Sequence, residues 1–214
     1  MEIRAYDESY VDSAQNSLGH AVDFAVMTLN IEADSFGKAL SVSTASKQFE
    51  IGNPKYVAGM TGCEFTREVL IETCTKHDDA EDVMYLDRSP EYWSGWALAF
   101  YQWYSKRSFM DILTIVPLSE IIKMYNIYHE QDIINFVEHM DKIIREKSEY
   151  TRLRIRRMNC GLSQSELAND SGVALRQIQL FEQKQRNINN ASSVTLLRLS
   201  KSLNCRIEDL MEYS

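Results

Sequence analysis

The segment 161–183, GLSQSELANDSGVALRQIQLFEQ, decides how the C-terminal part of this 214-residue chain folds. Ser163 is followed three residues later by Glu166, and this is the spacing of a capping box, in which each side chain satisfies a backbone N–H at a helix start. We therefore expect a helix to begin at Ser163. It should end about two turns later at Gly172, because glycine readily adopts the left-handed backbone of a tight turn.

A second helix is expected directly after that turn, from Ala174 to about Lys184. Two short helices joined by a turn of about three or four residues that contains glycine form a helix-turn-helix. The small core of this motif is predicted to consist of apolar side chains from both helices, namely Leu167, Ala168, Val173, Ile178 and Phe181.

Residues 151–211 resemble the Cro/CI-type helix-turn-helix family of phage repressors, also called the XRE family. The family implies a five-helix, lambda repressor-like domain whose second motif helix enters the major groove of double-stranded DNA. The resemblance rests on residue types at many spaced positions: Gly161, Leu162, Ser163, Gln164, Glu166, Leu167, Ala168, Gly172, Val173, Ile178, Glu182, Leu196, Leu199, Leu203 and the stretch 207–210.

The resemblance also implies which residues contact DNA. Arg176 is able to bond the edge of guanine and Gln177 or Gln179 that of adenine, while Leu175 offers an apolar contact in the same row. Phosphate contacts are expected from a helix start and from the loop after the second helix, that is, from Ser163, Gln164, Lys184, Arg186, Asn187 and Asn189.

Three residues depart from the family pattern. Ala174 stands where the family usually has a capping Ser or Thr, and losing that cap should cost about 1 kcal/mol. Lys184 stands where the family often has Gly, and Arg156 where its first helix usually has an apolar residue. Because Leu175 and Leu180 also occupy positions that should face the groove, these departures argue against tight sequence specificity.

Charge divides the chain into two parts with different partners. Residues 1–144 contain 11 Lys and Arg against 23 Asp and Glu, whereas residues 145–214 contain 12 against 8, so the net charge of −8 separates into −12 and +4. Phosphate contacts require basic groups, which only the C-terminal part has in excess. The arginines at 152, 154, 156 and 157 are interpreted as a DNA-facing or solvated helix.

The rest of the chain shows helical spacing of its apolar residues, so we predict an all-α protein. Its domains are predicted to be an acidic helical domain, 1–146, and a DNA-binding domain, 147–214, joined by helix or a short turn at 144–150. Predicted helices include 18–29, 34–49, 65–74, 118–125 and 133–144. An aromatic helix around Gly95, which allows a close neighbour, carries Tyr92, Trp93, Trp96, Phe100, Trp103 and Tyr104.

No feature of the sequence indicates an enzyme, a cofactor or a metal site. Phosphate-binding glycine loops, nucleophile elbows and paired-histidine motifs are missing, and Cys63, Cys74 and His77 match no zinc spacing. There is no apolar run long enough to span a membrane and no basic-then-apolar start, and the four cysteines stand singly. We therefore expect a protein of the reducing cytoplasm.

The most favoured function is a sequence-specific transcriptional regulator, a repressor that binds operator DNA as a homodimer. The stretches 49–56, FEIGNPKY, and 178–185, IQLFEQKQ, resemble those of uncharacterised bacterial regulators of toxin–antitoxin loci, which implies an antitoxin whose acidic domain masks a toxin-like protein. One alternative is a ligand-responsive regulator with a pocket lined by Trp93, Trp96 and Trp103. The aromatic helix itself is interpreted as the central core helix of the acidic domain, and its alternative is an exposed patch for a partner protein or a second subunit. A further alternative is an adaptor that no longer binds DNA.

Overall fold

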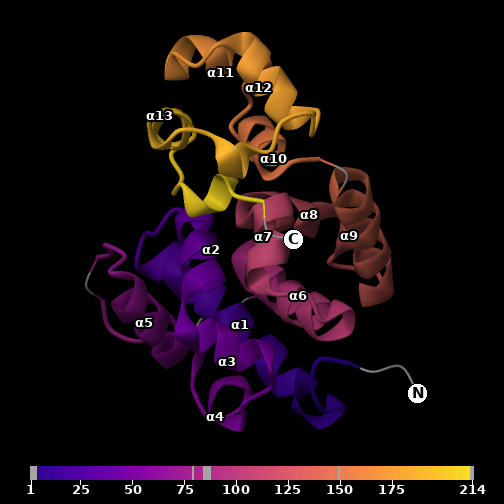
Figure 1. The fold of residues 1–214 in the computed structure, drawn as a ribbon. Coiled ribbons are helices and arrows are strands. Elements are labelled where there is room, and N and C mark those ends of the chain that lie inside the picture. Colours follow the sequence, from indigo (N-terminus) through magenta and orange to yellow (C-terminus); the bar gives the residue numbers. More distant parts are fainter. Residues whose placement is uncertain (1–3, 79, 84–87, 149, 213–214) are drawn as a thin grey trace. The chain divides into compact units, whose positions relative to one another are not determined.

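The structure is a computed structural model that describes residues 4–78, 80–83, 88–148 and 150–212 (Figure 1). These residues form helices, turns and loops and contain no strand, which confirms the predicted all-α fold. The chain divides into two compact units, Met1–Lys142 and Ile143–Ser214, called here the N-terminal unit and the C-terminal unit.

The N-terminal unit is organised around α1 (Val11–Asp23), which continues as a π-helical turn, η2 (Phe24–Thr28). Helix α1 packs along α6 (Pro90–Ser105) and against α5 (Gly62–Thr73). Gly95 of α6 lies so close to α1 that an added Cβ would meet the backbone oxygen of Leu18. Gly62 of α5 is equally confined, because its Cβ would lie 2.6 Å from the backbone nitrogen of Ala21. The close approach predicted at Gly95 is confirmed.

The aromatic residues of α6 belong to the core. Trp93 and Trp103 are each 8% exposed, and Trp96 is half-buried. The ring of Trp93 packs edge-on against Phe136 with centroids 5.4 Å apart, and Trp103 Nε1 donates a hydrogen bond of 2.8 Å to the backbone oxygen of Tyr6. The structure therefore favours the core-helix interpretation over an exposed patch.

One predicted helix, 34–49, is two helices in the structure, α2 (Ala33–Val42) and α3 (Thr44–Glu50). The break is at Ser43, whose backbone is extended at φ −68° and ψ 151° and whose hydroxyl accepts a hydrogen bond from the Ser46 N–H over 3.1 Å. Serine side chains compete in this way with continued helix. Two short helices, α4 (Pro54–Val57) and α7 (Phe109–Ile115), were not predicted.

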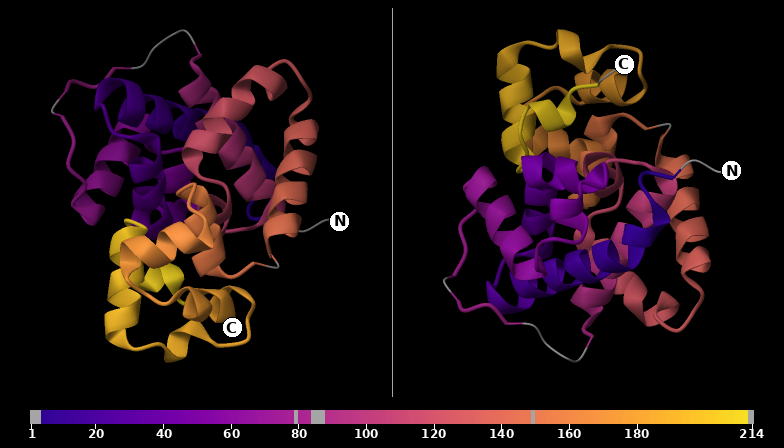
Figure 2. Two further views of the ribbon diagram at one scale, coloured as in Figure 1. Left: turned by 90° about the horizontal axis from the view of Figure 1, so that it is seen from above. Right: turned by 90° about the horizontal axis from the view of Figure 1, so that it is seen from below.

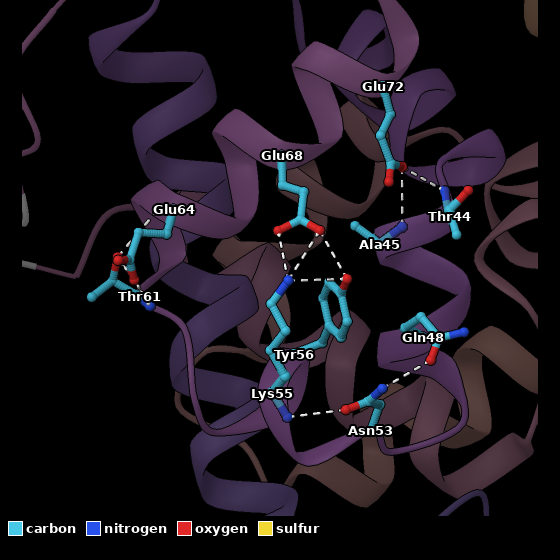
Figure 3. A network of polar contacts seen from close by, with 10 residues as sticks. All are labelled: Thr44, Ala45, Gln48, Asn53, Lys55, Tyr56, Thr61, Glu64, Glu68 and Glu72. Atoms are coloured by element: carbon cyan, nitrogen blue, oxygen red, sulfur yellow. Dashed lines mark hydrogen bonds and ion pairs between the residues drawn. The ribbon is translucent and has the colours of Figure 1, made fainter.

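A row of three glutamates on α5 ties the preceding segments together (Figure 3). Glu64, Glu68 and Glu72 are spaced four residues apart and therefore share one side of the helix. Their carboxylates accept hydrogen bonds from residues earlier in the chain: Thr61 for Glu64, Lys55 and Tyr56 for Glu68, and the N–H groups of Thr44 and Ala45 for Glu72. Helices α3 and α4 are thereby fixed against α5.

Two further helices complete this part of the chain, α8 (Leu118–Tyr128) and α9 (Ile133–Ser148). Phe136, Val137 and Met140 of α9 are buried. The helix continues past the boundary between the units at 142/143.

The C-terminal unit contains four α-helices and two 3₁₀ turns among its described residues (Figure 1; Figure 2). The predicted core is confirmed: Leu167, Val173, Ile178 and Phe181 are buried and Ala168 packs against them. Where a fifth helix is expected, the chain forms only a 3₁₀ turn, which buries a single side chain, that of Leu210. The elements are α10 (Arg152–Asn159), α11 (Gln164–Ser171), α12 (Leu175–Glu182), η3 (Ile188–Asn190), α13 (Ser193–Ser202) and η4 (Glu208–Leu210).

Candidate nucleic-acid interface

Helix α11 begins at the predicted capping box. The hydroxyl of Ser163 accepts a hydrogen bond from the Glu166 N–H over 3.2 Å, and Glu166 Oε2 accepts one from the Ser163 N–H over 2.7 Å. Hydrogen bonds to the carboxylate from the hydroxyl and from the backbone N–H of Ser163 hold the pKa of the Glu166 carboxyl below its usual range. The helix ends at Gly172, which is left-handed with φ +65°. Both predicted helix boundaries are confirmed.

Helix α12 follows after the turn, and no side chain caps its start. Its N-cap residue is Ala174, with φ −56° and ψ 132°, and no side-chain hydrogen bond reaches the first N–H groups from this position. The first N–H groups of a helix have no partner within the helix. The departure at Ala174 therefore leaves the first turn of α12 without a side-chain cap, while the Gln177 N–H bonds to the Ala174 backbone oxygen over 2.8 Å.

A buried ion pair holds α12 against the rest of the unit. Arg157 of α10 donates from Nε to Glu182 Oε1 over 2.7 Å and from Nη2 to Glu182 Oε2 over 2.9 Å. Gln164, at the start of α11, donates to Glu182 Oε2 over 2.8 Å. Because the Glu182 side chain is 1% exposed, the network connects three helices inside the unit.

The four arginines of α10 are interpreted from sequence as a solvated or DNA-facing helix, and for Arg157 that interpretation is wrong, whereas Arg152, Arg154 and Arg156 are half-buried. Arg157 is buried with Glu182, Arg156 lies 3.6 Å from the carboxylate of Asp209, and the Arg154 guanidinium lies 3.7 Å from the ring centroid of Tyr150. The signal that could have identified Arg157 is the motif residue Glu182, since a buried carboxylate requires a partner.

The predicted base-reading residues lie on α12. Leu175 is 37% exposed and Arg176 is exposed as well, whereas Gln177 and Gln179 are half-buried. Ile178, in the middle of this run, points into the core. The first turn of α12 thus presents Leu175 and Arg176 to solvent, and their contacts with bases stay predictions.

The predicted phosphate contacts fall into two groups. Lys184 and Arg186 are exposed on the loop after α12, where Lys184 has a left-handed backbone with φ +58°. The other group makes hydrogen bonds inside the protein. The Ser163 N–H donates to Glu166, the Gln164 amide donates to Glu182, and Asn187 Oδ1 accepts from the Asn189 N–H over 2.9 Å. Lys184 and Arg186 are therefore the cations best placed for an external anion.

Asn189 has a role that sequence reasoning missed. Its side-chain amide donates to the backbone oxygen of Glu212 over 2.6 Å, and its Oδ1 accepts from the Glu212 N–H over 2.9 Å. Both ends of the amide are thus used to hold the C-terminal segment. No local sequence pattern predicts this pairing, because the two residues are 23 positions apart.

Other candidate sites gain no geometric support. Trp93 and Trp103 are ten residues apart on α6, or about 15 Å along the helix, and they contact different segments. Within the described ranges, no cluster of three or more His, Cys, Asp or Glu side chains could hold a metal ion. None of the helices described is both long and apolar enough to cross a membrane.

Comparison with known proteins assigns the C-terminal part of the chain. Residues 152–214 match the family of Cro/C1-type HTH DNA-binding domains. No curated protein and no solved structure shows significant similarity to the chain. The match covers the capping box, the turn at Gly172, the buried pair Arg157–Glu182 and the exposed start of α12. Residues 152–214 therefore form a Cro/C1-type HTH DNA-binding domain, which implies that the protein binds DNA, and this match does not extend to the N-terminal unit.

Proposed function

We propose that this protein is a transcriptional repressor that recognises an operator sequence through α12. The observation that carries the proposal is the first turn of α12, where Leu175 and Arg176 are exposed while the end of the same helix is held by the buried Arg157–Glu182 pair. A helix held this way presents its N-terminal residues rigidly, as entry into a major groove requires.

Arg176 is proposed as the main base reader, because a guanidinium is able to bond guanine O6 and N7 together. Gln177 and Gln179 are proposed to read adenine, and Leu175 to contact a thymine methyl group. Lys184 and Arg186 are proposed to contact phosphates, supported by their exposure on the loop after α12.

The test begins by selecting bound sequences from random duplex DNA with the full-length protein. Affinity for the selected site is then compared between wild type, Arg176→Ala and Arg198→Ala. Arg198 is an exposed arginine of α13 outside the proposed contacts, so it controls for the loss of one positive charge. Arg176→Ala should weaken binding by about 5- to 150-fold and relax the preference at one base pair. Equal effects of the two variants would contradict the proposal.

We propose that the repressor acts as a homodimer in the cytoplasm. Binding to two half-sites about one helical turn apart raises an affinity that is modest for a single half-site. We expect α12 alone to bind modestly, because its start is uncapped and Leu175 is among its exposed residues. The selected sites should then be inverted repeats with centres about 10 base pairs apart. Selected sites without symmetry, together with a monomeric mass at micromolar protein, would argue against the dimer.

The N-terminal unit is proposed to bind a basic partner protein, such as the toxin of an adjacent gene, and no enzymatic role is proposed. The support is its charge, since residues 1–144 carry 23 Asp and Glu against 11 Lys and Arg. Co-production with a small basic protein encoded beside it should give a complex that weakens at high salt. The ligand-responsive alternative has less support, because Trp93 and Trp103 serve as separate core contacts.

A further inference from the structure

Glu212 lies where the C-terminal segment returns to the helix-turn-helix, and it is held there by its backbone. Its N–H donates to Asn189 Oδ1 over 2.9 Å, and its backbone oxygen accepts from Asn189 Nδ2 over 2.6 Å. The side-chain amide of Asn189 and the backbone of Glu212 are therefore joined by two hydrogen bonds. Asn189 belongs to the loop 183–190, called here the post-α12 loop, which ends in η3.

The carboxylate of Glu212 makes a second attachment at a different element. Its Oε1 accepts a hydrogen bond of 2.7 Å from the N–H of Arg152, the first residue of α10. The N-terminus of a helix has unsatisfied N–H groups and a partial positive charge, so it favours a carboxylate. Glu212 thus connects the post-α12 loop to the start of a helix that is itself fixed by the core residue Leu153.

The post-α12 loop is anchored in the core by Ile188, which is 3% exposed, but a partly open cavity of about 220 Å³ adjoins it. Leu153, Phe181 and Ile188 line this cavity together with Lys184, Arg186 and Asn187. Glu212 lies on the same cavity wall. Since side chains next to empty space lose contacts that would restrain them, the hydrogen bonds of Asn189 carry more of the restraint.

We propose that Glu212 is a positioning residue for DNA binding, which holds the post-α12 loop so that Lys184 and Arg186 meet the phosphates together. The proposal rests on the proposed function of α12 and its loop. Bulk electrostatics makes the opposite prediction: removing a carboxylate from a DNA-binding unit reduces repulsion and should strengthen binding. The sign of the effect therefore separates the two explanations.

The experiment measures the affinity of the full-length protein for a mixed-sequence 30-base-pair duplex over a salt series. Glu212→Ala should bind about tenfold more weakly than wild type, with the slope of log affinity against log salt reduced by about 1 to 2. Glu212→Gln, whose amide oxygen is still able to accept from the Arg152 N–H, should restore most of the affinity. Asn189→Ala should resemble Glu212→Ala, and the double variant should be no weaker than either.

Amide hydrogen exchange supplies the readout that does not depend on DNA. Glu212→Ala and Asn189→Ala should both raise exchange at Asn190 and Ala191, whose N–H groups bond within the loop, while exchange in α11 stays unchanged. A merely structural role would lower stability throughout the unit and leave the salt slope unchanged. Glu212→Ala that binds as tightly as wild type with an unchanged slope overturns the inference, whereas wild type that binds no duplex at low salt overturns the proposed function.

Discussion

Arg157 and Glu182 form a doubly hydrogen-bonded ion pair that joins α10 to the end of α12, over 2.7 and 2.9 Å. The guanidinium also donates to the backbone oxygen of Leu162 over 2.6 Å. The Arg157 side chain is 11% exposed and that of Glu182 is 1% exposed, so neither charge is solvated by bulk water. Each depends on the other for compensation.

Removing one member of this pair should therefore destabilise the unit strongly. Arg157→Met leaves the Glu182 carboxylate buried without its cation, and the free energy of unfolding should fall by about 3–5 kcal/mol. The measurement is urea denaturation of the full chain followed by far-UV circular dichroism. All three tryptophans lie in the N-terminal unit, so the fluorescence transition reports on that unit separately and serves as an internal control.

The double variant Arg157→Met with Glu182→Leu gives the sharper result. Because it removes both charges, it should recover most of the lost stability, since the cost arises from an unpaired charge and not from a missing contact. Additive losses from the two substitutions would show that the pair is not coupled as the distances indicate.

Local signals were sufficient for the boundaries of α11, but not for the expected fifth helix or for the break between α2 and α3. The capping box is formed by Ser163 and Glu166, which are three positions apart, and the turn at Gly172 depends on the backbone conformation of that one residue. The start of α3 has both a local and a distant cap: the Ser43 hydroxyl accepts from the Ser46 N–H, and Glu72 accepts from the N–H groups of Thr44 and Ala45, 28 and 27 positions away. A serine within an amphipathic run is compatible with a continued helix as well as with a cap, so the local pattern alone does not predict the break.

The same distinction explains what sequence reasoning missed at the candidate interface. Exposure of Arg176 follows from helical spacing once Ile178 is placed inside. The pairing of Asn189 with Glu212 depends on how the last segment folds back, and no periodicity encodes that. Asparagine in a loop is therefore equally compatible with a phosphate contact and with an internal one.

Lys184→Gly should stabilise the C-terminal unit. Lys184 has φ +58°, and a side chain with a Cβ is strained in this region by about 1–2 kcal/mol, whereas glycine is not. Part of the gain is cancelled by the greater freedom of glycine in the unfolded chain, which leaves about 0.5–1 kcal/mol. Urea denaturation measures the change. Lys184→Ala is the control, because it removes the charge and keeps the Cβ; equal stability of the two variants would refute the backbone explanation.

Ala174→Ser should also stabilise the unit, by about 1 kcal/mol. Ala174 already has the extended backbone of an N-cap residue, but its side chain has no acceptor for the N–H groups at the start of α12. A serine hydroxyl at this position is able to accept one of them. Thermal denaturation should show a raised midpoint for this variant, and none for Ala174→Val, which adds volume at the same exposed position without an acceptor.

Gly95→Ala should destabilise the N-terminal unit, because the new Cβ would meet the backbone oxygen of Leu18 and lie 2.8 Å from Val22 Cγ2. A backbone atom at the centre of two packed helices cannot move aside cheaply, so a loss of about 2 kcal/mol or more is expected. The tryptophan fluorescence transition in urea should shift to lower concentration, since Trp93 and Trp103 are buried on the same helix.

Gly161→Ala is the matched control, because Gly161 has φ +69° and nothing within 4 Å of an added Cβ. It should cost the strain of the left-handed backbone less the freedom that glycine loses on folding, about 0.5–1 kcal/mol, and in the C-terminal unit alone. The two alanine substitutions thus separate a collision from a conformational cost. If Gly95→Ala left the fluorescence midpoint in place, α1 and α6 would have to lie further apart than this structure has them, and the packing at the centre of the N-terminal unit would need a different explanation.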